Sequence, residues 1–274
     1  MIELPEAILL GRQMNDVLAG KTVTNVFNAT HVNKFAFFNG DPLAYKSLLT
    51  GLKIRSATGQ GIFVDIRFDN DVYLSICDGV KVKYNDRNSP VPDKYQLLLT
   101  FDDETFLTFT VAMYGGMYVY QNEFQNSYHR KSMERISALG ADFTEDYFSN
   151  FLNNEKPSLS LKAFLATEQR FPGIGNGVLQ DILFRAGLHP KRKLNTLTES
   201  NKNALYQSIK EVLATMLAKG GRDTENDLFG KAGGYPTILS KNTYQQACPK
   251  CGGTIIKENF MGGTIYYCPY CQPI

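Results

Sequence analysis

The sequence predicts a multidomain α+β protein, and three observations lead to that prediction. A single N-terminal helix is followed by short β-rich runs, helical periodicity replaces these runs in the second half of the 274 residues, and a four-cysteine segment ends the chain. These changes place boundaries near residues 125 and 236. We therefore expect a β-sandwich domain at 1–125, a helical domain at 126–236 and a small cysteine hairpin at 237–274.

The first domain is predicted to begin with one helix at residues 1–20. Pro5 and two glutamates stand at its front, apolar residues then recur at helical spacing, and Gly20 closes it. Many short strands at regular spacing follow, separated by turn clusters, which favours a β-sandwich or barrel. The predicted strands are Val23–Phe27, Phe35–Phe38, Gly61–Phe68, Asp71–Ile76, Val80–Tyr84, Tyr95–Phe101, Thr105–Thr110 and Gly116–Tyr120.

The second domain carries helical periodicity instead of alternation. A Gly- and Asp-rich segment, Gly220–Tyr235, ends it as a long loop, and loops of this length are often functional. The predicted helices are Met133–Leu139, Thr144–Leu152, Leu161–Thr167, Gly177–Ala186 and Ser200–Lys219.

Charge is distributed unevenly along the chain, although its net value is only +2. Residues 1–155 hold 14 basic against 19 acidic residues, whereas residues 156–274 hold 15 against 8. The basic half could bind a polyanion, or it could be a solvated face without a ligand. No apolar run approaches the ~20 residues of a membrane helix. Met1 opens directly onto Ile2 without a basic leader, so we expect a cytoplasmic protein.

The cysteines near the C-terminus have the spacing of a metal site. Two Cys-x-x-Cys pairs, each a tight turn that aims two sulfurs at one point, are separated by about a hairpin's length. Four thiolates and no open position predict a structural Zn²⁺ site, and two disulfides are the less favoured alternative in a reducing compartment. The predicted ligands are Cys248, Cys251, Cys268 and Cys271. Cys77 stands alone in an apolar stretch and is expected to be buried.

A second motif, Phe171-Pro-Gly-Ile-Gly-Asn176, precedes a predicted helix. Its glycines permit a tight turn, and a helix N-terminus presents free N–H groups that suit a phosphate. We expect Asn176 and the N–H groups of Gly175 and Gly177 to hold a DNA phosphate.

These segments together resemble one family. The run GIGNGVLQDILFRAGLHPKR is similar to the helix–two-turn–helix segment of the formamidopyrimidine-DNA glycosylase / endonuclease VIII family, and the ending YYCPYCQ, the start MIELPE and the loop GGRDTENDLFGKAGGY match the same family in the same order. The resemblance implies a catalytic-type β-sandwich, a helix–two-turn–helix DNA-binding domain and a zinc finger.

The same resemblance implies a function. It points to base excision repair by a bifunctional DNA glycosylase/AP lyase, in which an N-terminal amine breaks the glycosidic bond of a flipped base and cuts the strand through a Schiff base. The implied partner is double-stranded DNA with a damaged or abasic nucleotide. The protein would be a monomer, associated with the nucleoid when bound to DNA.

The candidate catalytic residues lie at the N-terminus. Family members mostly have proline after Met1, and here that position is Ile2, before which methionine is usually retained. The amine would then belong to Met1, displaced by about 3.8 Å of Cα spacing. Glu3 matches the family's catalytic acid, and Glu6 is also kept. We therefore expect weak or absent lyase activity.

Three DNA contacts of the family are replaced in this chain. Gln60 stands where a strand lysine approaches the lesion phosphate, Gly263 stands where the zinc hairpin has an arginine, and Met113-Tyr114-Gly115 replaces an Arg-Arg-Phe wedge. Met113 and Tyr114 could still act as apolar wedges, and Tyr114 could equally be a strand-end residue of the core. The candidate DNA-binding residues are Asn176, Gly175, Gly177, Lys162, Gln60, Met113, Tyr114 and Arg222. Lys162 could instead be a solvated helix charge.

Two functions of different class follow from the departures. The first is a DNA glycosylase/AP lyase with an altered nucleophile. The second is a non-catalytic protein that binds damaged or bent DNA and has lost the N-terminal proline chemistry. Trapping of a covalent adduct on abasic-site DNA with borohydride discriminates between them.

Overall fold

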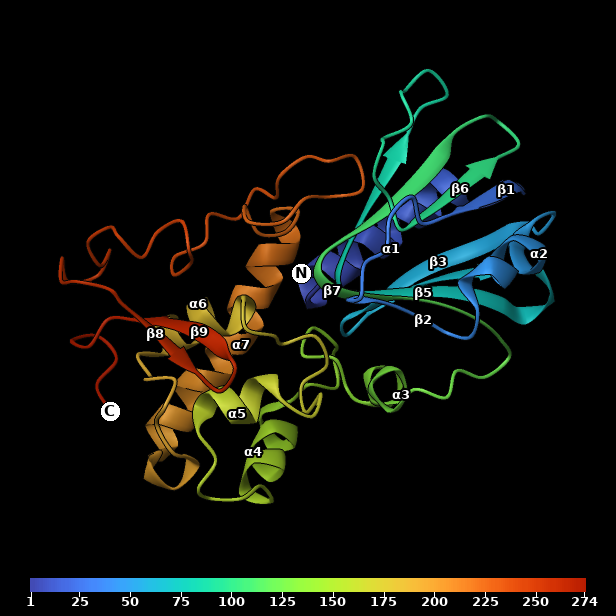
Figure 1. Cartoon of the computed structure of the whole chain (residues 1–274). Helices are drawn as coiled ribbons and strands as arrows, with labels where there is room; N and C mark the ends of the chain where they lie inside the picture. The colour runs from blue at the N-terminus through green and yellow to red at the C-terminus, as the bar shows by residue number, and fades with distance from the viewer.

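A seven-stranded sheet and one long helix form the N-terminal half of the chain, in a computed structural model that describes all of residues 1–274 (Figure 1). The strand order is β1-β6-β7-β5-β4-β3, and β2 pairs in parallel with β7. The elements of this half are α1 (Leu4–Leu18), β1 (Val23–Asn28), β2 (Ala36–Phe38), α2 (Tyr45–Leu49), β3 (Ile54–Gln60), β4 (Phe63–Phe68), β5 (Val72–Asn85), β6 (Leu97–Phe101) and β7 (Phe106–Gln121).

Helix α1 lies directly on strand β3 because glycines meet at the contact. A Cβ atom on Gly59 would lie 1.7 Å from the carbonyl oxygen of Ala7, and one on Gly11 would lie 2.3 Å from the backbone nitrogen of Gly59. Only glycine allows so close an approach of two backbones. This contact fixes the position of α1 on the sheet, and with it the position of the N-terminus.

The two layers of the expected sandwich are hydrogen-bonded into one sheet. Strands β5 and β7 are long and bent, and their register shifts between Asp78 and Val80. The expected strands Asp71–Ile76 and Val80–Tyr84 are therefore parts of β5, just as Thr105–Thr110 and Gly116–Tyr120 are parts of β7. Strand β3 and helix α2 were not expected from the sequence.

Helices form the next part of the chain, around a second core. Its 23 buried residues come mainly from α4 to α7, and Leu4 of α1 joins them. The expected helix at Met133–Leu139 is wrong: the helix lies earlier and ends at Glu134, so residues 135–139 are not helical. The helices are α3 (Ser127–Glu134), α4 (Glu145–Asn153), α5 (Leu161–Ala166), α6 (Val178–Ala186) and α7 (Glu199–Ala218). Gly220–Tyr235 contains no helix or strand, as expected.

A two-stranded hairpin, β8 (Ile256–Phe260) and β9 (Gly263–Tyr267), lies near the C-terminus and packs beside α6 (Figure 1). A small third core lies under it, and Phe184 of α6 and Leu239 join this core. None of the helices combines the length and the hydropathy that a membrane-spanning segment needs.

Candidate active site

The first residues of the chain cross the junction between the two large cores. Ile2 packs in the core of the sheet, whereas Leu4 packs in the helical core. The N–H of Ile2 donates to the carbonyl of Asp78 at 2.7 Å, and the N–H of Leu4 donates to that of Gly173 at 2.9 Å. The chain is thus fixed between β5 and the turn before α6, and the N-terminus lies between the two halves of the molecule (Figure 1).

Glu3 occupies the N-terminus of helix α6. Its side chain is 2% exposed, and its two carboxylate oxygens accept the N–H groups of Gly177 at 2.8 Å and Val178 at 2.7 Å. An anion at this end of a helix is stabilised by the free N–H groups and the helix dipole. Burial raises the pKa of the Glu3 carboxyl, and Glu6 adds to this, whereas Arg222 and the two N–H groups act in the opposite direction.

Arg222 connects the two N-terminal acids. Its guanidinium donates to both carboxylate oxygens of Glu6, at 2.9 and 2.7 Å, and lies 3.4 Å from the carboxylate of Glu3. Although burial alone would lower the pKa of Arg222, the charges of Glu3 and Glu6 raise it. The residue is 2% exposed and its charge is paired with the two acids inside the protein, so the contact with DNA that the sequence predicts for Arg222 is not prepared in this structure.

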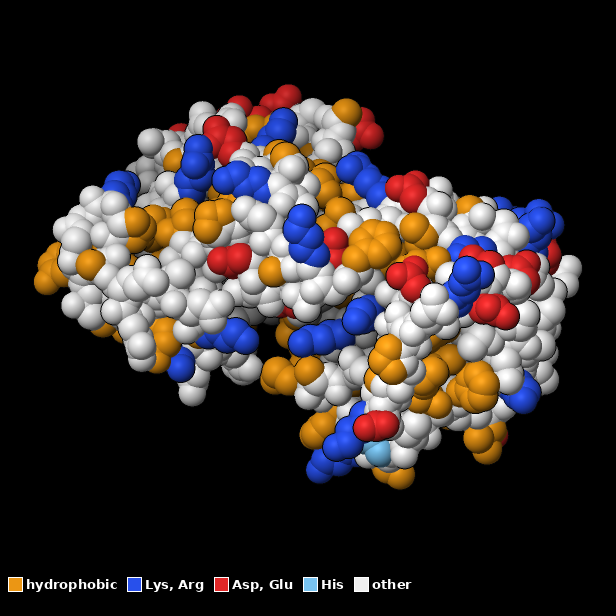
Figure 2. Space-filling view, turned by 90° about the horizontal axis from the view of Figure 1, so that it is seen from above, with side chains coloured by type: hydrophobic (Ala, Val, Ile, Leu, Met, Phe, Trp, Pro, Cys, Tyr) orange, Lys and Arg blue, Asp and Glu red, His pale blue; other side chains and the backbone are white.

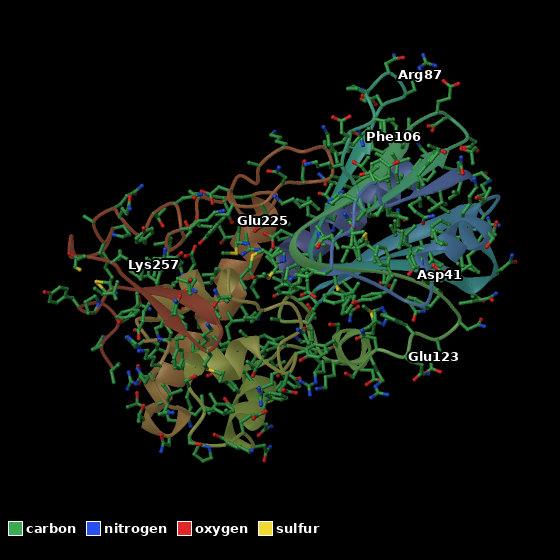
Figure 3. The ribbon with its side chains drawn as sticks, viewed as in Figure 1. Asp41, Arg87, Phe106, Glu123, Glu225 and Lys257 are labelled. Atoms are coloured by element: carbon green, nitrogen blue, oxygen red, sulfur yellow. The ribbon has the colours of Figure 1, made fainter.

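Residue 1 is held by the loop that carries Arg222. The N-terminal ammonium forms an ion pair with Glu225, and the carbonyl of Met1 accepts a hydrogen bond from Arg222 at 3.1 Å. Figure 3 places Glu225 at the junction between the helical part and the sheet. Glu225 was not among the residues singled out in the sequence, because a single acid in a polar loop carries no pattern.

Asp78 is a second acid that sequence reasoning missed. It lies at the irregularity of β5 with a φ of 56°, a left-handed conformation that is uncommon outside glycine. Burial raises the pKa of its carboxyl, while the Cys77 thiol and the N-terminal ammonium lower it. The sequence signal that could have pointed to Asp78 is the Asp78-Gly79 pair, which interrupts a largely apolar segment.

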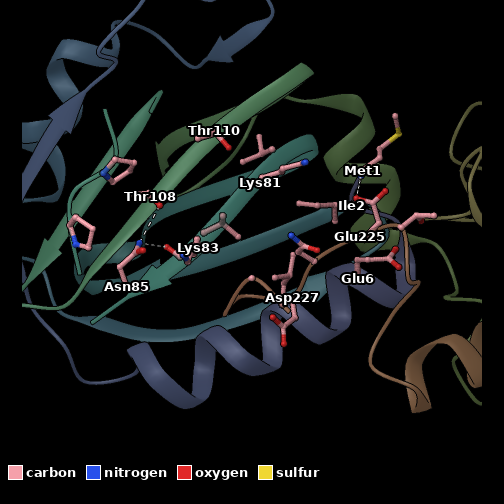
Figure 4. Close-up of a pocket in the computed structure, with 18 residues that line it drawn as sticks. Met1, Ile2, Glu6, Lys81, Lys83, Asn85, Thr108, Thr110, Glu225 and Asp227 are labelled. Atoms are coloured by element: carbon pink, nitrogen blue, oxygen red, sulfur yellow. Dashed lines mark hydrogen bonds and ion pairs between the residues drawn. The ribbon is translucent and has the colours of Figure 1, made fainter. Parts of the chain in front are cut away.

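A cavity of about 360 Å³ opens beside the N-terminus (Figure 4). Met1 and Ile2 line one end together with Glu225, strands β5 and β7 contribute Lys81 and Thr110 among others, and residues 224–227 of the loop complete the lining. This volume lies at the lower end of the range of small-ligand pockets. Neither Lys81 nor Lys83, which also lines the cavity, forms an ion pair.

The turn before α6 does not present the expected phosphate cradle. The N–H of Gly177 is donated to Glu3, and the side chain of Asn176 donates to the carbonyl of Thr264 in β9 at 2.8 Å. Two of the three groups predicted to hold a phosphate, the Gly177 N–H and the Asn176 amide, thus have partners within the protein. Asn176 ties α6 to the hairpin, and its Oδ1 is buried without a hydrogen-bond partner.

Lys162 and Gln60 also have intramolecular partners. Lys162 is 5% exposed and donates to the carbonyl of Phe260, so it is not a solvated helix charge; burial lowers its pKa. Gln60 donates to the carbonyls of Ser132 at 2.9 Å and Met133 at 3.1 Å. Its amide therefore joins β3 to α3 and is not free for a phosphate.

Met113 and Tyr114 lie on the surface of β7, with exposed fractions of 67% and 40%. The alternative that placed Tyr114 in the core is therefore wrong. Burial of part of the ring raises the pKa of the Tyr114 phenol, and the charges of Asp78 and Glu3 raise it further.

Four cysteines converge beside the hairpin. The sulfur atoms of Cys248, Cys251, Cys268 and Cys271 all lie within 4.8 Å of one another. The pairs Cys248–Cys271 and Cys251–Cys268 are 3.8 and 3.5 Å apart, whereas a disulfide needs about 2.05 Å. The four residues could hold a metal ion. Cys77 is buried elsewhere, beside Ile62 and Phe63.

A hollow separates two lobes of the molecule in the space-filling view, and Lys and Arg side chains lie along its edge (Figure 2). The hairpin and helices α4 to α7 belong to one side of this division, and the sheet with α1 and α2 belongs to the other (Figure 1).

Comparisons with known proteins agree with this architecture. The formamidopyrimidine-DNA glycosylase H2TH domain matches residues 136–227. Formamidopyrimidine-DNA glycosylase of Brevibacillus brevis is 26% identical over 278 residues, which cover 99% of each chain. The protein of the same name from Bacillus cereus is 26% identical over 282 residues, which cover 100% of this chain and 99% of the relative.

Solved structures show the same fold. Lactococcus lactis Fpg in complex with DNA that contains an abasic site superposes with a TM-score of 0.83 at 22% identity, covering 99% of this chain and 100% of the other. The wild-type Lactococcus lactis protein bound to DNA with an N7-benzyl-Fapy-dG gives a TM-score of 0.84 at 21% identity, with the same coverage.

Proposed function

Because the chain belongs to the formamidopyrimidine-DNA glycosylase / endonuclease VIII family, we propose that it recognises damaged nucleotides in double-stranded DNA during base excision repair. The observation that carries this proposal is the meeting of three features at one junction: the N-terminal amine, the buried Glu3 carboxylate and a cavity that could receive a base. Arg222 joins the first two, because it contacts both Met1 and Glu3.

We assign the nucleophile to the amine of residue 1. The neutral amine attacks C1′ of the damaged nucleotide, the bond from C1′ to the base breaks, and the base leaves with a proton. The nitrogen then loses its own proton, the sugar ring opens, and a Schiff base joins nitrogen and C1′. Loss of a proton from C2′ expels the 3′-phosphate and cuts the strand. Glu3, with a raised pKa, assists ring opening and proton transfer.

Placement limits this chemistry. Ile2 is fixed by burial and by its hydrogen bond to Asp78, so residue 1 extends past the position that a residue-2 amine would occupy. Placement errors of about 1 Å already cost activity in enzymes. Lyase activity of the wild type is therefore weak or absent.

Fewer cationic side chains are available to contact the DNA phosphates than the family resemblance would suggest. Gly263 carries no side chain, Gln60 is bound to α3, and Lys162 lies beneath the hairpin. The exposed Met113 and Tyr114 remain available as apolar wedges in the gap left by a flipped base.

The four cysteines fit a structural Zn²⁺ ion. A tetrahedral zinc with ~2.3 Å bonds to sulfur places its sulfur atoms about 3.8 Å apart. The two sulfur pairs of this chain, at 3.5 and 3.8 Å, match that spacing. With four protein ligands the ion has no open position, so it holds the hairpin and takes no part in the reaction.

Borohydride trapping on duplex DNA with an abasic site tests the proposal. A covalent adduct at the N-terminal peptide supports the glycosylase/lyase. Tight, salt-dependent binding without an adduct supports the non-catalytic alternative, which the comparisons do not favour, since the relatives are named glycosylases. Absence of binding to damaged DNA overturns both. A DNA substrate implies a cytoplasmic, nucleoid-associated protein, and we expect it to act as a monomer.

A further inference from the structure

The loop after α7, and not helix α1, holds the N-terminal amine. The ammonium of Met1 is paired with Glu225, and the carbonyl of Met1 is bound by Arg222, which is itself anchored on Glu6. Figure 4 shows the contact between Met1 and Glu225 at one end of the cavity. Both partners are partly buried, with exposed side-chain fractions of 35% and 23%, so the pair is less screened by water than a surface pair.

This contact opposes the reaction that we assign to the amine. A nitrogen that attacks C1′ must offer a lone pair, and an ammonium has none. As long as the ion pair with Glu225 is intact, the nitrogen points to the carboxylate and donates to it. The pair must therefore be broken, and one proton must pass to water, before a carbon–nitrogen bond can form.

The acids around residue 1 have different partners. Glu6 is bound to Arg222, and Asp227, farther along the loop, accepts hydrogen bonds from Gln13 and from backbone N–H groups. Asp78 accepts a weak hydrogen bond from the neighbouring thiol. Among these acids, Glu225 is the one that accepts a hydrogen bond from the N-terminal ammonium. Removing its charge therefore takes away the direct partner of the amine, leaves the charge of Asp78 as a more distant influence, and keeps Arg222 bound to Glu6.

We propose that Glu225 is a positioning residue that clamps and masks the N-terminal amine in the DNA-free protein. This inference rests on the proposed function only for the catalytic role of the amine. The clamp itself is a property of the free protein and can be measured without DNA.

Carbamoylation by cyanate measures the clamp directly. Cyanate adds to a neutral amine and gives a urea, and the mass of the N-terminal peptide reports its rate. The intact mass must first show that the chain begins with Met1. We expect the amine of Glu225→Gln to react about two- to fivefold faster than the wild type, the factor for loss of a partly exposed ion pair. Glu225→Asp keeps the carboxylate and should remain closer to the wild type.

Two controls separate the clamp from general effects. Glu134→Gln removes the charge of an exposed acid on α3 that forms no ion pair, and its N-terminus should react at the wild-type rate. Lysine ε-amines labelled in the same samples should react equally in all variants. An unchanged or slower rate in Glu225→Gln overturns the proposal, and so does a chain that begins at Ile2.

Abasic-site DNA distinguishes this inference from the proposed function. If the amine is the nucleophile, borohydride-trapped adduct should form faster in Glu225→Gln than in the wild type by a similar factor. If neither protein forms an adduct while cyanate still discriminates them, the lyase chemistry is refuted and the clamp stands.

Discussion

Replacing Arg222 by methionine should destabilise the protein more than any surface substitution. Arg222 is 2% exposed and donates four hydrogen bonds: two from the guanidinium to the side chain of Glu6, one from the backbone N–H to the same carboxylate, and one from the guanidinium to the carbonyl of Met1. Three of these involve the guanidinium, which also lies 3.4 Å from Glu3. Methionine fills similar space but leaves two buried carboxylates without a cation.

The magnitude follows from that uncompensated charge. Breaking a buried ion pair by removing one partner costs about 3–5 kcal/mol. Arg185 offers the matched control, because it pairs with Glu211 at the surface, with side chains 55% and 52% exposed. Loss of an exposed pair costs about 0–1 kcal/mol. Urea denaturation of Arg222→Met and Arg185→Met, followed by circular dichroism at pH 7.5, measures both differences in the free energy of unfolding.

The destabilisation should shrink in acid. Arg222 lowers the pKa of the buried Glu3, so its removal raises this pKa further above the ordinary value of 4.5. A carboxyl whose pKa is raised in the folded state binds a proton there before it does in the unfolded chain. Stability then increases as the pH falls from the raised pKa toward 4.5. Denaturation of Arg222→Met at pH 5.5 should therefore bring it closer to the wild type than at pH 7.5. Equal stability of the two variants at pH 7.5, or a gap that does not narrow in acid, would refute the reasoning.

Three further substitutions test other parts of the account. Cys251→Ser should abolish stoichiometric zinc in metal analysis and weaken DNA binding while the sheet keeps its circular dichroism; a variant that retains zinc contradicts the four-cysteine site. Gly11→Ala forces a Cβ to within 2.3 Å of Gly59, and we expect a loss of about 1–3 kcal/mol in denaturation, which a stable variant would disprove. Ile2→Pro should favour removal of Met1 and increase borohydride trapping; a processed variant without more adduct shows that placement is not the limiting defect.

Much of the fold was predictable because it depends on local pattern. The helix at 1–20, the loop at Gly220–Tyr235 and the cysteine spacing each carry a signal within a few residues of sequence. Strand β3 was missed for the opposite reason: its sequence, IRSATGQ, has few apolar side chains. It is a strand because it pairs with β4, and glycine lets α1 lie against it, a contact between residues almost fifty positions apart.

The candidate site was predictable only in part. Glu3 and Glu6 were found through a resemblance at the start of the chain, but their partner was assigned to DNA. An arginine in a polar loop resembles a phosphate contact, and only the fold reveals that Arg222 is turned inward onto two acids 216 or more positions away. Asp78 and Glu225 depend in the same way on contacts between distant segments, which composition and spacing do not encode.

The two acids that contact Arg222 differ in how many hydrogen bonds they lose when the guanidinium is removed. Glu6 receives three of the four hydrogen bonds of Arg222, whereas Glu3 accepts the N–H groups of Gly177 and Val178 and keeps them when the guanidinium is removed. Once the cation is gone, Glu6 is therefore the acid that loses more partners, because only the backbone N–H of residue 222 still donates to it. Glu6→Gln added to Arg222→Met should recover part of the lost stability, because a neutral amide is less costly to bury than a carboxylate. Substitutions at residues in contact do not have additive effects on the free energy of unfolding. The recovered stability therefore measures the coupling between Glu6 and Arg222. A double variant less stable than Arg222→Met alone would show that Glu6 has another partner on which the junction depends.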